Sequence, residues 1–397
     1  MKFAHLSDCH LGGWREPKLR DANTKAFVMA TDKILKENVD FVLIAGDLFN
    51  TAVPGIDSVR LAVEQLKRLK DNNIPVYFIA GSHDFSPSGK TMLDVLEHAG
   101  LAKNVAKGGE ENKKLRLNFT VDKKTGVKIA GMIGKKGGLE KEYYDVLDRE
   151  SLEKESGKKI FMFHSAVSEL KPKELELMDA MPASLLPKGF DYYAAGHVHV
   201  VERGNVSGKK IVYPGPCFPN NFAELEKLKT GSFVLFDNSE AKHVALEPFK
   251  VHSFSLNAQD KSPSEVEKSL QELLKNVDVK NAIVTIRVFG CLSKGKPADV
   301  AWNDVFHSLY QRGAYHVMRN TFALVSNELE QVILPHASEG DMETALLYEH
   351  AGQFKLKNKD ISVAKNLMQV FSAEKLDGEK VADFESRVCS DAEKLFK

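Results

Sequence analysis

The sequence predicts a protein of the α/β class, with a large layered domain, a small second α/β unit and a helical C-terminal segment. Up to about Pro248, short apolar strands alternate with amphipathic helices. From residue 251 the alternation repeats on a smaller scale, and beyond Pro335 the strand-like runs stop. A chain of 397 residues has room for two or three domains. We therefore place the domains at residues 1–250, 251–330 and 331–397.

In the first half of the large domain, predicted strands alternate with predicted helices. Apolar runs, which predict buried strands, end shortly before Asp8, Asp47 and Ser82. The segments between and after them have helical spacing of apolar residues, and the predicted helices are Asp21–Leu35, Asp57–Lys70 and Thr91–His98. Strands separated by helices of this length favour a parallel sheet covered by helices.

Later strands follow one another with less helix between them. We expect them at Leu115–Val121, Lys128–Met132, Ile160–Phe163, Tyr192–Ala195, Lys210–Tyr213 and Ser232–Phe236. Their crowding suggests a second sheet that packs on the first. Pro216–Glu226 reads as a loop over the site, with Phe218 and Phe222 either stacking on a substrate or packing under the loop.

The second unit and the tail have simpler patterns. The small unit is expected to contain strands and helices in the order β-α-β-α-β, at Val251–Leu256, Ser264–Leu274, Ala282–Phe289, Val300–Tyr310 and Tyr315–Val325. The tail is expected to form helices at Asp341–Ala351, Val363–Phe371 and Gly378–Leu395. Because short amphipathic helices cannot bury their apolar faces alone, the tail should dock on its own body or on a partner.

Composition narrows the class of protein. The formal net charge is +0, so no global field indicates a polyanionic partner, although a local basic patch would suffice. The four cysteines lie far apart and form no CxxC pair, which is typical of a reduced, intracellular protein. No leader and no run of ~20 apolar residues is found, so we expect a cytoplasmic protein without a membrane span.

Five polar clusters carry the chemistry, and each follows a strand-like run. They are Asp8 with His10, Gly46 with Asp47, the stretch Gly81–Asp84, His164, and Gly196 with His197 and His199. Each cluster alone is weak, since any α/β protein offers such residues. Because ligand sites in open α/β sheets lie beyond the carboxyl ends of strands, all five together predict a single shared site.

Carboxylate oxygens and imidazole nitrogens without thiolates suit Mn, Fe or Zn ions and argue against an iron–sulfur centre. A carboxylate such as Asp47 can be shared, which suggests two ions rather than one. Two ions ~3.5–4 Å apart favour an in-line displacement at phosphorus.

This set of motifs resembles the signature of the calcineurin-like metallophosphoesterases, which is D-x-H, G-D, G-N-H-[DE], H and G-H-x-H. The stretches Phe3–Gly12, Ala45–Phe49 and Val212–Gly215 resemble the Mre11/SbcD DNA-repair nuclease branch. The protein-phosphatase branch usually has an arginine soon after G-D, and Asp47–Gly55 has none. The resemblance implies a four-layer α/β/β/α sandwich with a small capping domain. It covers residues 1–250 well, the next unit loosely and the tail not in detail.

The resemblance also implies roles for individual residues. Asp8, His10 and His199 would hold one metal ion, His164, His197 and Ser82 the second, and Asp47 would bridge both. His83 would act on the transition state or protonate the leaving oxygen, and Asp84 would orient its ring. Two Mn²⁺ ions are the expected cofactors, with other divalent metals possible. Lys135 and Lys136, in a basic loop, are candidates for contact with DNA phosphates, as against a merely solvated loop.

The chain departs from the family pattern at two positions. Ser82 stands where the family has asparagine, and Asn50 stands where some relatives have a further histidine. An amide oxygen reaches farther than a hydroxyl, so Ser82 would bind through a water or leave the second ion weakly held.

Three functions remain open from the sequence. The first is a Mn-dependent DNA exonuclease or endonuclease of double-strand break repair, forming a homodimer and binding a Rad50-like coiled-coil ATPase through the tail from about Asp341. The second is a phosphodiesterase for a small phosphodiester or nucleotide. The third is a non-catalytic scaffold for DNA ends or an ATPase, with a metal site weakened at Ser82.

Overall fold

The computed structural model of the chain describes residues 1–86, 89–135, 139–176, 178–237, 240–326, 358–373 and 381–395. It divides into two compact units, Met1–Glu328 and Leu329–Lys397. The first unit holds two six-stranded sheets and a smaller four-stranded sheet.

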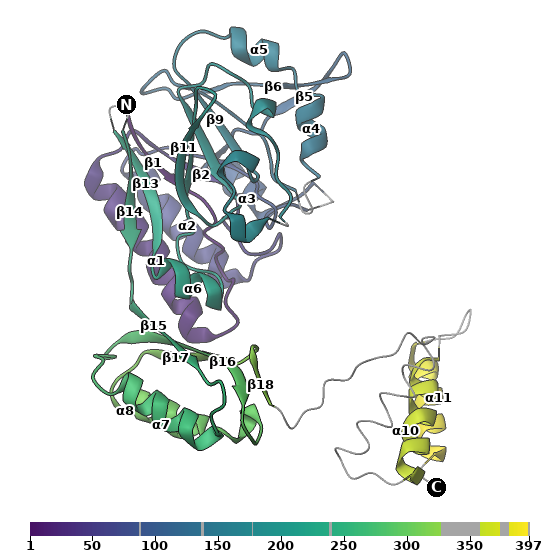
Figure 1. Cartoon of the computed structure of the whole chain (residues 1–397). Helices are drawn as coiled ribbons and strands as arrows, with labels where there is room; N and C mark the ends of the chain where they lie inside the picture. Colours follow the sequence, from purple (N-terminus) through teal and green to yellow (C-terminus); the bar gives the residue numbers. More distant parts are fainter. Residues whose placement is uncertain are drawn as a thin grey trace. The chain divides into compact units, whose positions relative to one another are not determined.

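The first sheet has the strand order β14-β13-β1-β2-β3-β4, and its strands β14, β13, β1 and β2 are labelled in Figure 1. Its strands are β1 (Lys2–Leu6), β2 (Phe41–Ala45), β3 (Val76–Ile79), β4 (Lys103–Asn104), β13 (Gly231–Asp237) and β14 (Glu240–Leu246). The pairs β1–β2, β2–β3 and β3–β4 are parallel, while β13 pairs with β1 antiparallel. The carboxyl ends of β1, β2 and β3 therefore lie at one edge of the sheet.

The second sheet has the order β11-β12-β10-β9-β8-β7. Its strands are β7 (Thr120–Val121), β8 (Lys128–Gly131), β9 (Lys159–His164), β10 (Tyr192–Gly196), β11 (Val201–Val206) and β12 (Lys209–Pro214). The central strands β8, β9, β10 and β12 are mutually parallel. A separate hairpin joins β5 (Gly108–Glu111) to β6 (Lys114–Leu117).

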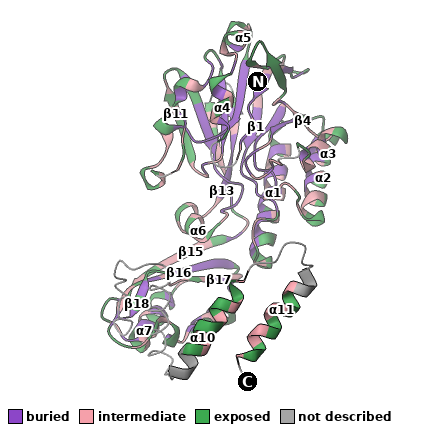
Figure 2. Ribbon diagram, turned by 90° about the vertical axis from the view of Figure 1, so that its right-hand side faces the viewer, coloured by how far each residue is buried: buried purple, intermediate pink, exposed green. Residues whose placement is uncertain are grey.

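The sheets pack on each other through a core that includes Phe3, Phe41, Ile160 and Tyr192. The outer face of the first sheet is covered by α1 (Pro17–Glu37), α2 (Ile56–Asp71) and α3 (Met92–His98). The outer face of the second carries α4 (Lys141–Asp145), α5 (Arg149–Lys154) and long loops. Figure 2 shows central strands such as β1 buried, while helices such as α1 and α2 also carry exposed residues. The predicted α/β/β/α sandwich is confirmed.

The small α/β unit has its own core around Val266, Leu270, Val284, Ile286 and Trp302. It consists of β15 (Lys250–Asn257), α7 (Pro263–Leu274), β16 (Ala282–Leu292), α8 (Trp302–Gln311), β17 (His316–Asn320) and β18 (Leu324–Ser326). β16 lies between β15 and β17 in a parallel sheet. The assignment of residues 251–330 as a separate capping domain stays a prediction.

The strand predicted over Tyr315–Val325 is wrong as a single element. The chain turns after Asn320, whose side-chain Oδ1 accepts a hydrogen bond from the Phe322 backbone at 3.1 Å. It then forms β18, which pairs farther along β16. The sequence also gave no sign of β11 and β14, because these edge strands alternate little between apolar and polar residues and form by pairing with β12 and β13.

The tail contains α10 (Asn358–Phe371) and α11 (Val381–Lys394), close to two of the predicted helices. The helix predicted at Asp341–Ala351 lies outside the described residues. No helix of the described residues is long and apolar enough to cross a membrane.

Candidate metal centre

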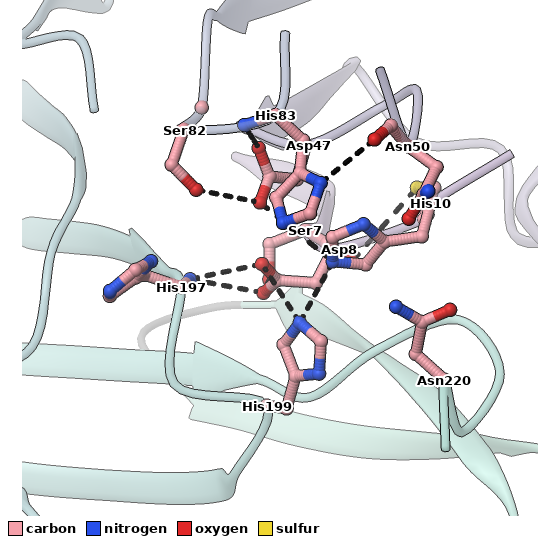
Figure 3. Close-up of polar contacts among 12 residues, drawn as sticks. Ser7, Asp8, His10, Asp47, Asn50, Ser82, His83, His197, His199 and Asn220 are labelled. Atoms are coloured by element: carbon pink, nitrogen blue, oxygen red, sulfur yellow. Dashed lines mark hydrogen bonds and ion pairs between the residues drawn. The ribbon is translucent and has the colours of Figure 1, made fainter. Parts of the chain in front are cut away.

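The predicted residues meet where parallel strands of the two sheets end (Figure 3). Asp8 and Asp47 follow β1 and β2, His164 is the last residue of β9, and His199 follows β10. The Asp8 and Asp47 side chains are 1% and 2% exposed, so both carboxylates are buried beside imidazoles. The structure thus brings together side chains that follow different strands, as expected from the five polar clusters.

The backbone at these strand ends turns back sharply. Asp8, His10, Asp47, His197 and His199 all have positive φ, from 43° to 98°. Such conformations cost residues other than glycine about 1–3 kcal/mol each, and Asp and His tolerate the left-handed region better than most. The packing of the sandwich therefore has to hold five strained residues at one rim.

Two glycines let the strand ends approach each other. A Cβ on Gly46, whose φ is +90°, would lie 2.3 Å from Nδ1 of His164, and one on Gly196 would lie 2.2 Å from the Ala45 carbonyl. That carbonyl lies 2.8 Å from His164 Nδ1, which must donate to it. The other ring nitrogen, Nε2, is thereby turned toward the two carboxylates.

In the described part of the chain, three groups of residues each offer ligand atoms that lie within 4.8 Å of one another. They are Asp8, His10 and His199; His10, Asp47 and His83; and Asp8, Asp47 and His164. The first group is the set predicted for one ion. Asp8, His10 and Asp47 occur in two groups each, as expected for a pocket that more than one cation shares.

The fine geometry fits a cation better than a set of hydrogen bonds. His164 Nε2 is 3.1 Å from Asp47 Oδ2, yet it is buried and not aligned as a hydrogen-bond donor to any group. His10 Nε2 and His199 Nε2 are 2.8 Å apart, two nitrogens aimed at the same space. A buried polar atom without a partner, such as His164 Nε2, is costly, and a metal ion beside it would satisfy it. An ion between His10 and His199 would replace the hydrogen bond that their two rings can make.

Charge in the pocket follows from burial and the carboxylates. Burial opposes protonation of His164, but Asp47 outweighs it and raises the His164 pKa to about 10. Burial likewise opposes protonation of His199, but Glu224 and Asp8 raise its pKa to about 9. Burial opposes ionisation of Asp47, yet His164 holds the Asp47 pKa well below its usual range. The buried carboxylates thus favour positive charge, which a divalent cation supplies, displacing protons as it binds.

The predicted ligands His197 and Ser82 do not belong to the three groups of ligand atoms described above. The His197 backbone N–H donates to both Asp8 oxygens at 3.0 and 3.2 Å, while its ring lies against that of His164 with centroids 5.1 Å apart. Burial, followed by the charge of His164, lowers the His197 pKa to about 4. The Ser82 hydroxyl donates to Asp47 Oδ2 at 3.3 Å. The Ser82 side chain thus lies beside the pocket, and its contact with the pocket is the hydrogen bond to Asp47.

His83 stands at the open side of the pocket. Its backbone N–H donates to Asp47 Oδ1 at 2.7 Å, and its ring packs edge-on against His10 with centroids 4.7 Å apart. The ring Nδ1 is 2.8 Å from the Asn50 carbonyl, so Nδ1 carries the proton and Nε2 is left for chemistry.

The expectation that Asp84 orients the His83 ring is wrong, because the Asn50 carbonyl has that position. The buried Asp84 carboxylate instead accepts backbone N–H groups of Leu48, Phe49 and Gly81 at 3.0–3.2 Å. Burial, then repulsion from Asp47, raises the Asp84 pKa to about 7, and the N–H groups of Phe49 and Gly81 act in the opposite direction. Asp84 therefore ties together the two loops that carry Asp47 and Ser82.

The residues predicted to act outside the pocket are the two lysines of the basic loop and the aromatic residues of Pro216–Glu226, and the contact of the lysines with DNA stays a prediction. The Lys135 ammonium lies over the Tyr143 ring, 4.0 Å from its centroid, which is a cation–π contact. Lys136 lies outside the described residues. Phe218 is 1% exposed and belongs to a packed core, so of its two alternatives packing under the loop is confirmed and stacking on a substrate is excluded.

Glu224 contacts the site although no sequence motif pointed to it. Part of the expected loop Pro216–Glu226 is helix α6 (Phe222–Leu228), whose first turn is capped by the Asn221 side chain. Glu224 Oε1 lies 2.9 Å from His199 Nδ1. An N-cap asparagine followed three residues later by glutamate is a helix-start signal, and it could have revealed the helix but not its partner.

Comparison with known proteins agrees with this geometry. Residues 1–201 match the family model described as calcineurin-like phosphoesterase. The chain is 30% identical over 304 residues to the DNA double-strand break repair protein Mre11 of Archaeoglobus fulgidus, covering 72% of this chain and 67% of that protein. It is 28% identical to the protein of the same name from Methanococcus maripaludis, covering 69% and 73%. For Sulfolobus acidocaldarius Mre11 the identity is 27%, covering 73% and 75%.

The matched region contains the strand ends that carry Asp8, Asp47, His164 and His199, and the family uses divalent metal ions. The relatives match well beyond residue 201, into the small α/β unit. The chain therefore belongs to the calcineurin-like phosphoesterases, in their Mre11 branch, and is a metal-dependent hydrolase of the phosphodiesterase and nuclease type.

Proposed function

We propose that this protein is a Mn²⁺-dependent DNA nuclease acting at double-strand breaks, with two ions in the site. The observation that carries the proposal is the buried pocket in which Asp8, Asp47, His10, His164 and His199 converge. Its relatives, named as double-strand break repair proteins, supply the substrate class. When bound, the ions would supply an activated water and neutralise the phosphate charge.

The ligands are assigned as the motif suggests. Asp8, His10 and His199 would hold one ion, and Asp47 would be shared. His164 and His197 would hold the second, with Ser82 acting through a water, since its hydroxyl already contacts Asp47. His83 presents Nε2 to the leaving oxygen, because its Nδ1 proton is engaged by the Asn50 carbonyl.

We also propose the partners of this protein. The tail helices α10 and α11 would bind a Rad50-like coiled-coil ATPase, and the exposed Met368 and Phe371 offer apolar contacts. We expect the protein to form a homodimer and to bind DNA. A cytoplasmic location would fit the four cysteines, none of which forms a disulfide in the described part of the chain. Deletion of residues 331–397 should abolish ATPase association; unchanged association would refute the assignment of the tail.

The test compares wild type with His83→Ala and Asp47→Ala in Mn²⁺. Substrates are linear duplex DNA, single-stranded DNA, bis-p-nitrophenyl phosphate and cyclic nucleotides. We expect DNA cleavage by wild type, a loss of 10²-fold or more in His83→Ala, and loss of metal binding in Asp47→Ala. Cleavage of the small diesters alone would make the protein a small-molecule phosphodiesterase. Fewer than two bound ions, with cleavage gained in Ser82→Asn, would identify a scaffold.

A further inference from the structure

Glu224 is held firmly against a proposed metal ligand. Its Oε1 lies 2.9 Å from Nδ1 of His199 and accepts from the Asn221 side chain at 2.6 Å, while its Oε2 accepts from the Asn220 backbone at 2.7 Å. Its side chain is 18% exposed. A carboxylate with this many fixed donors cannot swing away from the imidazole.

The contact decides which nitrogen of His199 faces the pocket. With the Nδ1 proton engaged by Glu224, Nε2 points at the ligand cluster, 2.8 Å from His10 Nε2 and 3.6 Å from Asp8 Oδ1. A carboxylate behind a histidine fixes the tautomer and the ring orientation and makes the free nitrogen a better metal ligand.

Helix α6, which carries Glu224, also contacts the small α/β unit through Glu226. Arg287 on β16 donates to the Glu226 carboxylate from Nε at 3.0 Å and from Nη2 at 2.5 Å. The Arg287 guanidinium also lies 5.4 Å from the centroid of the Phe222 ring. Paired nitrogens on a carboxylate fix orientation as well as distance.

The apolar face of α6 joins the same contact. Leu225 is fully buried in a cluster that includes Leu19 and Ala22 of α1, Ile283 of β16 and Phe249. Helix α6 is therefore packed between the sandwich and the small unit, with one glutamate directed at each.

We propose that Glu224 is the positioning residue of His199, and that the Arg287–Glu226 pair fixes α6, so that the small α/β unit sets the geometry of a metal ligand. This inference rests on the proposed function, because it takes His199 as a ligand. Loosening Arg287 would allow α6 to shift, and the imidazole would lose its fixed partner.

The experiment titrates the full-length protein with Mn²⁺ and follows free Mn²⁺ by its electron paramagnetic resonance signal. Glu224→Gln keeps the shape and removes the charge, and we expect Mn²⁺ affinity to fall ten- to a hundredfold. Glu224→Asp keeps the charge but shortens the side chain, so it should lose less; it also serves if the glutamine variant folds poorly. DNA cleavage by Glu224→Gln should recover once Mn²⁺ exceeds its raised dissociation constant.

Arg287→Met tests the link to the small unit. It should lower affinity several-fold, and adding it to Glu224→Gln should cause little further loss, since both act through one contact. The matched control is Lys227→Met, on the same helix, because the Lys227 side chain is 63% exposed and lies 3.6 Å from the exposed Glu174. It should leave affinity within twofold.

The outcomes separate the inference from the function. If wild type binds Mn²⁺ and cuts DNA while Glu224→Gln binds Mn²⁺ equally well, the inference is wrong and the function stands. If the Arg287 and Glu224 losses are independent and multiply, the coupling through α6 is wrong. If wild type binds no Mn²⁺, both the inference and the proposed function fall.

Discussion

Replacing Asp84 by alanine tests whether this carboxylate supports the fold or acts through His83. The buried side chain accepts three backbone N–H groups, from Leu48, Phe49 and Gly81. Alanine would leave all three donors without an acceptor in a site that is 1% exposed. An unsatisfied buried donor costs about 1–3 kcal/mol, and relief of the repulsion with Asp47 offsets part of the sum. We expect Asp84→Ala to lose about 3–6 kcal/mol of unfolding free energy.

The assay is urea denaturation followed by circular dichroism, beside Mn²⁺-dependent cleavage of DNA. Asp84→Asn is the control, because its amide oxygen still accepts hydrogen bonds and its shape is the same. It should lose roughly half as much stability or less. If Asp84→Ala unfolds at the wild-type urea concentration but cleaves DNA 10²-fold more slowly, the structural reasoning fails and Asp84 acts on His83 after all.

Three further predictions concern metal and pH. Mn²⁺ at 100 times its dissociation constant should stabilise the protein by about 2.7 kcal/mol, and chelation should reverse this; an unchanged melting temperature would count against a resident cation. Ser82→Asn should strengthen binding of the second ion about tenfold, because the longer amide can reach past Asp47; equal calorimetric titrations of both proteins would contradict this. Burial, followed by the charge of His243, lowers the His5 pKa to about 3. Since unfolded His5 takes up a proton near pH ~6.5, stability should fall below that pH by up to about 1.4 kcal/mol per unit. The fall should be shallower in His5→Asn, and parallel curves for both proteins would exclude the contribution of His5.

Local pattern was enough to predict the strand ends. Apolar runs before Asp8, Asp47, His164 and His197 predict strands whatever the rest of the chain does, because alternation and burial are properties of a few neighbouring residues. Parallel strands share an edge, so the meeting of motifs within each sheet followed from the sequence as well, while the packing of the two sheets brings their two edges together. The elements β11, β14 and α6 were not predicted, because their apolar pattern is weak. Strand pairing forms β11 and β14, and a side-chain cap begins α6.

The sequence by itself determined which side chains reach the rim of the sandwich. Only the tertiary structure decided which of them touch: Glu224 behind His199, the Asn50 carbonyl at His83, and Asp84 on backbone rather than on imidazole. These partners are set by the packing of two sheets and a short helix, which brings together groups 25 to 36 residues apart. A side chain's neighbours along the chain fix its element, but the order and stagger of whole strands fix its contacts.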